Sequence, residues 1–521
     1  MNVELRDPNV IMKLSRLGSF HQSKLSFLRS FLREFKDWEY KRDLFNLDQN
    51  GYGEAVYSFK KKHRIYSLVC FANEIKDDER SDRVIATKWD AAFTLHDGVP
   101  SKNDIERLKN EVPKQEVGRL SFKELTLSRA NKSVRVFNHV VEALSNGEQP
   151  DLDLLSKVGY LYRTTAVYGS GKFGLADRFR IKNREEINGP FRLEMMLVYL
   201  VRQFTFDQVN HVAHHKNPKK AVNLDEKICK NLGIGNSTGL GMAPFIVNHP
   251  TLLNNWILSR ETALKKIREI KNVSEKDSKL FTDCVKKSLT NITSWNTDSE
   301  YQQNKIKSLL NDVKKFINHI ENKFDFKTEY AFNEIYLWIE KETCEECIEY
   351  IVSIMLEPYN HITEPLVKNM SSEEEKYFNI PTNRTVEELR TIIEKKYPNI
   401  LDINFEKQEN YQNFWFISKN KEEPRLADRF EENGSELEQP LAIARDIKKL
   451  YEKLLVSKNS LTIAEFLSNS SELRHVVRRA FIVEKFPYSE IQDNTIGKNI
   501  IPIDMLRLKL SFFGALKFDP R

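Results

Sequence analysis

Residues 51–72 read GYGEAVYSFKKKHRIYSLVCFA, and this stretch decides the fold class of the N-terminal part of the chain. Residues 53–60 and 64–72 are each rich in the β-branched and aromatic residues that favour strands. The polar run KKKH at 60–63 separates the two and predicts a turn. The stretch therefore predicts a β-hairpin.

Similar runs lie on both sides of this hairpin. Residues 40–47 (YKRDLFNL) and 83–98 (RVIATKWDAAFTLHDG) also have the composition of strands. Residues 9–36 instead repeat apolar side chains at helical spacing. These patterns predict an antiparallel meander of about four strands that packs against the first helices.

Beyond residue 100 the apolar spacing favours helices. The run ELTLSRANKSVRVFNHVVEAL at 124–144 is one predicted helix, and Arg129, Lys132 and Arg135 recur in it every three residues. On a helix these side chains share one side and form a cationic surface, or simply a solvated face. Residues 331–356 read as one long helix that contains Cys344 and Cys347.

The fold class predicted from these patterns is α+β and predominantly α-helical. A chain of 521 residues is too long for one core and divides into about two to four domains. We expect four parts: an α+β region with the meander (1–100), a helical core with two glycine-rich loops (101–262), a polar helical connector (263–330) and a mainly helical C-terminal region (331–521).

Composition indicates the cellular setting. The formal net charge is only +6 in 521 residues, so no strong global field draws the chain to nucleic acid or to an anionic membrane. Five widely spread cysteines argue against a disulfide framework, and the C-x-x-C of Cys344 and Cys347 lacks the second pair that a zinc site needs. With no secretory signal and no long apolar run, we expect a soluble cytoplasmic protein with no membrane partner.

Glycine is scarce, with 18 residues in the chain, yet two tight clusters fall between residues 160 and 250. The first, Gly169, Gly171 and Gly174, fits the G-x-G-x-x-G spacing of a dinucleotide loop, but no second strand is evident after it. A Walker loop fits worse, because Phe173 follows Lys172 where Ser or Thr is needed. What remains is glycine-rich backbone with cationic neighbours, which either cradles an anion or forms a tight turn.

The second cluster is more specific. Residues 233–244 read GIGNSTGLGMAP and lead into an amphipathic segment. A glycine-rich loop with short polar side chains before a helix start favours a phosphate or carboxylate.

The two clusters together predict a binding site for a small anion. The predicted substrate-binding residues are Arg163, Gly169, Gly171, Arg178, Gly235, Asn236, Ser237, Thr238 and Gly239. The predicted catalytic residues are Lys172, His249 and Tyr168. Lys172 could also form an imine with a carbonyl substrate or with pyridoxal phosphate.

A metal site is a separate hypothesis. Asp207, His211 and His215 are spaced by four residues in an apolar helix, so they lie on one face, and the two imidazoles have the spacing of a metal pair. Glu194 or a distant residue is an alternative third ligand for a divalent metal. The other interpretation is a helix end whose histidines complement the helix dipole.

Three functions therefore stand at this point. The first is a soluble enzyme, of a transferase or lyase type, that acts on a phosphate, a carboxylate or a CoA ester. The second is a nucleic-acid-binding protein, which the small net charge disfavours, with the candidate residues Arg129, Lys132, Arg135, Arg474, Arg478 and Arg479. The third is a non-catalytic helical scaffold. The apolar tail at 500–521 predicts packing on the body or a contact in a homo-oligomer.

Overall fold

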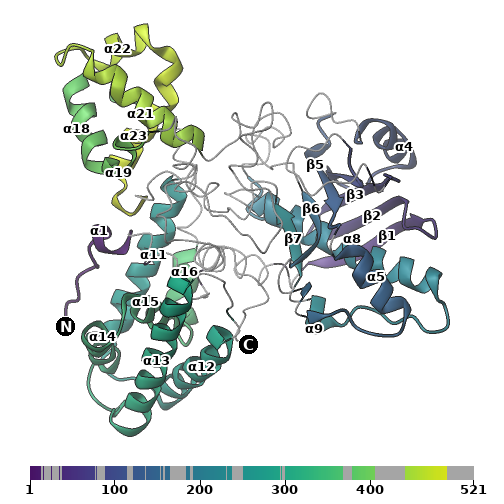
Figure 1. Ribbon diagram of the computed structural model, residues 1–521, viewed down its shortest axis with the longest axis horizontal. Coiled ribbons are helices and arrows are strands. Elements are labelled where there is room, and N and C mark those ends of the chain that lie inside the picture. The colour runs from purple at the N-terminus through teal and green to yellow at the C-terminus, as the bar shows by residue number, and fades with distance from the viewer. Residues whose placement is uncertain are drawn as a thin grey trace.

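A computed structural model of the protein describes most of the chain (Figure 1). It describes residues 1–12, 16, 25, 35, 38–76, 78, 88–113, 121–134, 136–152, 154–155, 159–164, 183–187, 192–229, 232–236, 250–293, 295, 300–367, 378–404 and 441–489. The elements form a sheet with covering helices, a body of packed helices, and a C-terminal helical unit.

The sheet has seven strands in the order of the sequence. They are β1 (Glu39–Leu47), β2 (Gly53–Lys61), β3 (Arg64–Ala72), β4 (Ala91–Asp97), β5 (Glu124–Lys132), β6 (Tyr160–Thr164) and β7 (Gly233–Asn236). Neighbours from β1 to β6 are antiparallel, and β6 and β7 are parallel. The prediction of a mixed, mainly helical fold is confirmed, but the prediction of about four strands is wrong. The sheet also draws strands from both sides of residue 100.

The predicted hairpin is confirmed. Strands β2 and β3 pair in continuous register up to Lys61 and Arg64. The turn needs one residue in the left-handed conformation, and Lys62 adopts this conformation with a φ of 56°. Such a conformation is uncommon for a residue with a side chain, and tight turns are where it occurs.

The predicted helix at 124–144 is wrong over its first half. Residues Glu124–Lys132 form β5, and only Phe137–Ser145 form a helix, α5. Strand β5 lies between β4 and β6, so both of its edges are paired. Pairing on two sides outweighs the local preference, which is how tertiary contacts commonly override propensity.

Helices cover both faces of the sheet. On the inner face lie α5 and α8 (Arg192–Lys216), and short α9 (Glu226–Cys229) precedes β7. On the outer face α4 (Lys102–Glu111) starts at a capping box made by Ser101 and Asp104. The apolar residues buried beneath α4 are Val56, Val69, Phe71, Ala92 and Leu127, in contact with Leu108 and Val112.

Phe204 of α8 is the aromatic centre of the inner face. Its ring lies edge-on to Phe93 of β4 at 5.8 Å and to Tyr57 of β2 at 6.4 Å. We expect Phe204→Ala to lower the free energy of unfolding by about 3–5 kcal/mol, because it leaves a large cavity between helix and sheet. Urea unfolding would measure this. Phe122→Ala, at a site that is 62% exposed, is the matched control and should change little; equal effects of the two substitutions would contradict the packing described here.

The helical body follows the sheet. Its helices are α11 (Pro250–Arg268), α12 (Glu275–Thr293), α13 (Glu300–Asn322), α14 (Ala331–Glu342), α15 (Glu345–Met355) and α16 (Asn360–Val367), joined by short α1 (Pro8–Ile11). The predicted single helix at 331–356 is wrong, since Thr343 is extended and Cys344 caps a new helix. The break lets α14 and α15 pack against each other. Their buried residues join one core with the inner face of the sheet.

The C-terminal unit has a core of its own. Its elements are α18 (Val386–Lys396), α19 (Pro398–Leu401), α21 (Leu441–Leu455), α22 (Ile463–Asn469), η5 (Ser471–Leu473), α23 (Arg474–Lys485) and η6 (Pro487–Ser489). Figure 1 shows this unit apart from the sheet. Its last element, η6, contacts α11 and α1, and Tyr488 belongs to the core of the body.

Across the described residues, no helix combines the length and the apolar character needed to cross a membrane.

Candidate functional site

The parallel pair of strands brings the ends of β6 and β7 together. Arg163 of β6 is the register partner of Gly235 of β7, and Thr164 is the partner of Asn236. Parallel neighbours end at the same edge of a sheet, so β6 and β7 end side by side (Figure 1). Gly233 and Gly235 of the second glycine cluster lie in β7, while the first cluster and the rest of the second lie outside the described residues.

Strand β7 is held in place by α8. The Arg202 guanidinium donates from Nε to the Leu232 carbonyl at 2.5 Å and from Nη2 to the Cys229 carbonyl. Burial lowers the pKa of Arg202. The amide of Gly233 also donates to the Gly159 carbonyl at 2.9 Å, at the start of β6. The beginning of β7 is thus fixed on both sides, although a glycine-rich strand has little intrinsic preference for the extended form.

The outer face near this edge carries polar side chains. Tyr162 faces inward, where its hydroxyl donates to Gln208 of α8 at 3.0 Å, so Arg163 lies on the opposite face. In register with it are Asn131 of β5 and Gly235 of β7. Arg163 is 3% exposed. A buried guanidinium beside a glycine backbone is an arrangement that suits an anion.

A second guanidinium lies on the same face. Arg129 is two residues before Asn131 in β5, and its guanidinium stacks over the Trp89 ring at 4.7 Å. Burial lowers the pKa of Arg129. Arg129 of β5 and Arg163 of the neighbouring strand β6 therefore lie on the same outer face. The two side chains give this part of the sheet a positive charge.

Asp90 holds in position the cross-strand row formed by Asn131, Arg163 and Gly235. Its amide donates to Asn131 Oδ1 at 2.9 Å, and its carboxylate accepts the Lys132 amide at 2.9 Å. This reciprocal pair ties the start of β4 to the end of β5. Asn131 is therefore a positioning residue for the row that contains Arg163.

The predicted cationic helix face is wrong. On strand β5, Arg129 and Lys132 point to opposite faces, because side chains alternate along a strand. The Lys132 ammonium lies 4.7 Å from the ring centres of both Tyr52 and Phe137, which is a buried cation–π arrangement on the inner face. Arg135 lies outside the described residues.

The proposed metal ligands have other partners. The Asp207 carboxylate accepts the Tyr57 hydroxyl at 2.9 Å and pairs with Arg42 at 3.3 Å. His211 Nε2 lies 2.8 Å from the Asp48 carbonyl, and His215 Nδ1 lies 2.9 Å from the His211 carbonyl. In the described part of the chain, no group of three His, Cys, Asp or Glu side chains is arranged to hold a metal ion. Asp207 and His211 instead attach the β1–β2 hairpin to α8, and burial together with Asp207 raises the pKa of Tyr57.

Cys344 and Cys347 lie at the start of α15. Burial raises the pKa of Cys344 to about 12 and also raises the pKa of Cys347, which is fully buried. Both thiols are therefore protonated at neutral pH, which suits packing rather than redox chemistry.

Many predicted residues cannot be placed. Those outside the described residues are Tyr168, Gly169, Gly171, Lys172, Arg178, Ser237, Thr238, Gly239 and His249. Of the predicted binding residues, the structure brings together Arg163, Gly235 and Asn236.

A polar row under α4 was not predicted from the sequence. Ser67, His96 and Glu124 are register neighbours on β3, β4 and β5, and all three are buried. His96 Nδ1 lies 3.2 Å from the Gly98 carbonyl, and Glu124 accepts from Arg107 at 2.8 Å. Ser67 Oγ, His96 Nε2 and Glu124 Oε2 have no hydrogen-bond partner among the described residues. Polar residues at the outward positions of otherwise apolar strands were the signal that could have found this row.

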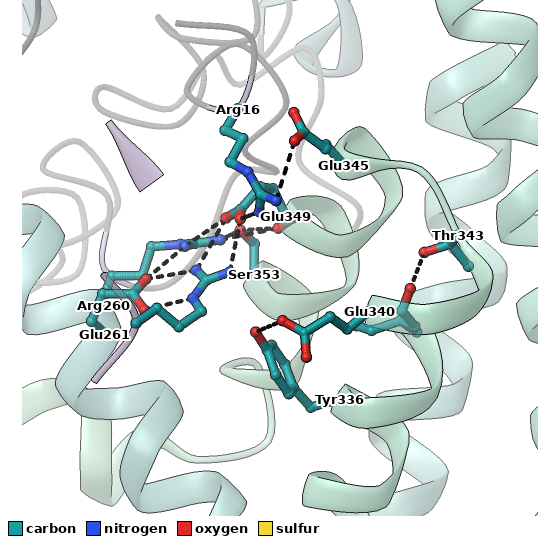
Figure 2. A network of polar contacts seen from close by, with 11 residues as sticks. Arg16, Arg260, Glu261, Tyr336, Glu340, Thr343, Glu345, Glu349 and Ser353 are labelled. Atoms are coloured by element: carbon teal, nitrogen blue, oxygen red, sulfur yellow. Dashed lines mark hydrogen bonds and ion pairs between the residues drawn. The ribbon is translucent and has the colours of Figure 1, made fainter. Parts of the chain in front are cut away.

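A buried cluster of charges was also missed (Figure 2). It lies between α11 and α15, where Arg260 and Glu261 of α11 meet Glu349 of α15. Arg6 pairs with both carboxylates at 2.7 Å. Burial alone would raise the pKa of Glu349, but Arg6 and Arg260 more than offset it, so the pKa falls to about 2.

Comparison of the chain with protein-family models, with curated proteins and with solved structures finds no match in any of the three.

Proposed function

We propose that the protein is an enzyme for a small anionic substrate, a phosphate, a carboxylate or a CoA ester, bound where β6 and β7 end. The parallel pairing of these strands, which has a register shift between Tyr160 and Arg163 and then sets Arg163 opposite Gly235, is the observation that supports the proposal. In sequence, the first glycine cluster follows β6, and the second begins within β7. In open α/β sheets, ligands bind outside the carboxyl ends of parallel strands, and the proposal places its ligand at the corresponding end of this pair by analogy.

The described sheet has one parallel pair, at its edge. Every neighbour from β1 to β6 is antiparallel, and only β7 runs parallel to its neighbour. Glycine-rich backbone supplies N–H groups without covering side chains, and these groups favour an anion. Arg163 lies in register with Gly235 and adds a full positive charge.

The proposed roles follow from residue chemistry. Arg163, Lys172 and Arg178 neutralise the anion, Asn236, Ser237 and Thr238 orient it, and Tyr168 or His249 transfers protons. Lys172 as an imine-forming amine is a variant of the same proposal, with a carbonyl substrate or pyridoxal phosphate. An absorbance band near the visible edge in the purified protein, lost in Lys172→Ala, would identify that variant.

Ligand-dependent melting of the full chain tests the binding site. The panel is inorganic phosphate, pyrophosphate, small carboxylates, coenzyme A and nucleotides. A ligand at about 100 times its Kd should stabilise the wild type by about 2.7 kcal/mol, which is seen as a rise in Tm. Arg163→Gln should weaken binding about 10- to 100-fold, because it removes a charge-assisted hydrogen bond donor.

The matched control is Arg268→Gln. Arg268 is a part-buried arginine of the helical body that binds Asn333 at 2.9 Å, so its substitution should leave ligand binding unchanged. Arg163→Lys keeps the charge and should retain part of the affinity. A panel with no stabilising ligand, or equal stabilisation of the wild type and Arg163→Gln, would rule the proposed site out.

A further inference from the structure

We propose that residues 1–7 are a detachable intramolecular ligand, whose Arg6 fills a preformed guanidinium site made by Glu261 and Glu349. This site is separate from the β6–β7 edge and does not depend on the proposed function. Its ligand class is an extended peptide that carries an arginine, supplied here by the chain itself.

The guanidinium of Arg6 is bound by two carboxylates, each through two hydrogen bonds. Nε and Nη2 donate to the two oxygens of Glu261, both at 2.7 Å. Nη1 and Nη2 donate to the two oxygens of Glu349, at 2.7 Å and 3.2 Å. Planar two-oxygen recognition of this kind selects Arg over Lys, whose ammonium is a point charge.

The site is held in shape without Arg6. Arg260 contacts Glu261 at 3.2 Å and Glu349 at 3.0 Å, and it also donates to Ser353 at 2.9 Å (Figure 2). Arg16 adds a further contact to Glu349 at 3.0 Å. The two carboxylates therefore stay in place when Arg6 leaves.

Charge completes the specificity. Without Arg6, the carboxylates of Glu261, Glu349 and Glu345 face the guanidiniums of Arg260 and Arg16. With Glu345, whose side chain is 43% exposed, the cluster then has one negative charge in excess, while the more deeply buried Glu261 and Glu349 are balanced by Arg260 and Arg16. The two-oxygen geometry therefore selects Arg6, and the charge of Arg6 completes the neutralisation of the whole cluster.

The segment has the irregular, largely exposed course of a peptide bound to a protein surface. Residues 1–7 belong to no helix or strand, and most of their side chains are exposed. Their backbone groups bond to side chains of distant residues among those described. The Val3 amide donates to the Glu269 carboxylate at 2.9 Å, and the Arg6 carbonyl accepts the Tyr488 hydroxyl at 2.9 Å. Of residues 1–7 only Val3 buries an apolar side chain, whereas Ile11 and Met12 belong to the core of the body. A segment with few apolar contacts, such as residues 1–7, opens more readily than the core.

Docking of the segment also reaches the C-terminal unit. Tyr488 lies in η6, directly after α23, and its amide donates to Asn254 of α11 at 3.1 Å. Burial, and then Glu261, raises the pKa of Tyr488 to about 12, so its hydroxyl stays a donor. Release of residues 1–7 therefore removes one of the contacts that hold η6 on the helical body.

Peptide binding in trans is the test. The full chain with Arg6→Ala is mixed with a labelled peptide of residues 1–7, MNVELRD. The peptide should bind this chain and not the wild type, whose own segment fills the site. The peptide carrying Arg6→Lys should bind at least about tenfold more weakly. If the folded Arg6→Ala chain binds both peptides equally, or neither, the proposal is wrong.

Native-state hydrogen exchange on the wild-type full chain decides the case in which Arg6→Ala does not fold. The amides of Val3 and Tyr488 should exchange together, in an opening that leaves the amides of α15 protected. Exchange of Val3 only together with α15 would show that residues 1–7 are an inseparable part of the core, and would overturn the proposal.

Discussion

Glu349→Gln is expected to lower the free energy of unfolding by about 3–5 kcal/mol, which is the usual cost of removing one partner from a buried ion pair. Glu349 is fully buried and accepts from Arg6, Arg16 and Arg260. Glutamine keeps the size of the side chain but removes the charge. The three guanidiniums would then have Glu261 as their remaining buried carboxylate.

Urea unfolding of the full chain measures this effect. The matched control is Glu329→Gln, because Glu329 pairs with Lys271 at 3.0 Å on the surface, where both side chains are more than half exposed. Exposed pairs contribute little to stability, so the control should unfold as the wild type does. A Glu349→Gln chain as stable as the control would mean that the buried cluster contributes nothing to folding.

Acid should destabilise the wild type through the same carboxylate. The pKa of Glu349 is about 2 in the folded chain and 4.5 as its reference value. Because the folded pKa is the lower one, the stabilisation is complete above pH 4.5 and is lost as the pH falls towards 2. This difference corresponds to about 3 kcal/mol.

The free energy of unfolding as a function of pH tests this prediction, and Glu349→Gln is its control. The variant has no carboxylate to protonate at this position, so its stability should fall less steeply between pH 4.5 and 2. Parallel curves for the two proteins would show that Glu349 is not the group that titrates.

Elements that depend on residues close together in the sequence could be predicted from the sequence. The β-branched and aromatic residues of 53–72, divided by the polar run KKKH, predicted β2 and β3 correctly. The start of α18 is equally local, since the Thr385 hydroxyl and the Glu388 carboxylate, three residues apart, form a capping box. In both cases the partners are close in sequence, so the pattern contains the whole interaction.

The missed elements depend on distant partners. Strand β5 has a helical pattern of charges and is a strand because β4 and β6 pair with both of its edges. Strand β7 is so rich in glycine that only its pairing with β6 makes it a strand. The break between α14 and α15 has no Gly or Pro to announce it.

The candidate site was half predictable for the same reason. Glycine clusters and their cationic neighbours are visible in the sequence, but the parallel pairing that sets Arg163 opposite Gly235 is not. The buried charge cluster was not predictable at all, because Arg6 and Glu349 lie 343 residues apart and each is a common surface residue type.

The pairing of β6 with β7 also sets the order in which the sheet can assemble. Lys61 meets Arg64 across a tight turn, whereas Tyr160 has to meet Gly233 across all of α8 and α9. Closing a longer loop costs more chain entropy, so contacts between distant residues form later during folding. We therefore expect β7 to join the sheet last, so that a nascent chain that has not yet reached residue 233 holds at most β1–β6 and lacks the pair of Arg163 and Gly235. Any site that needs this pair then depends on a completed sheet.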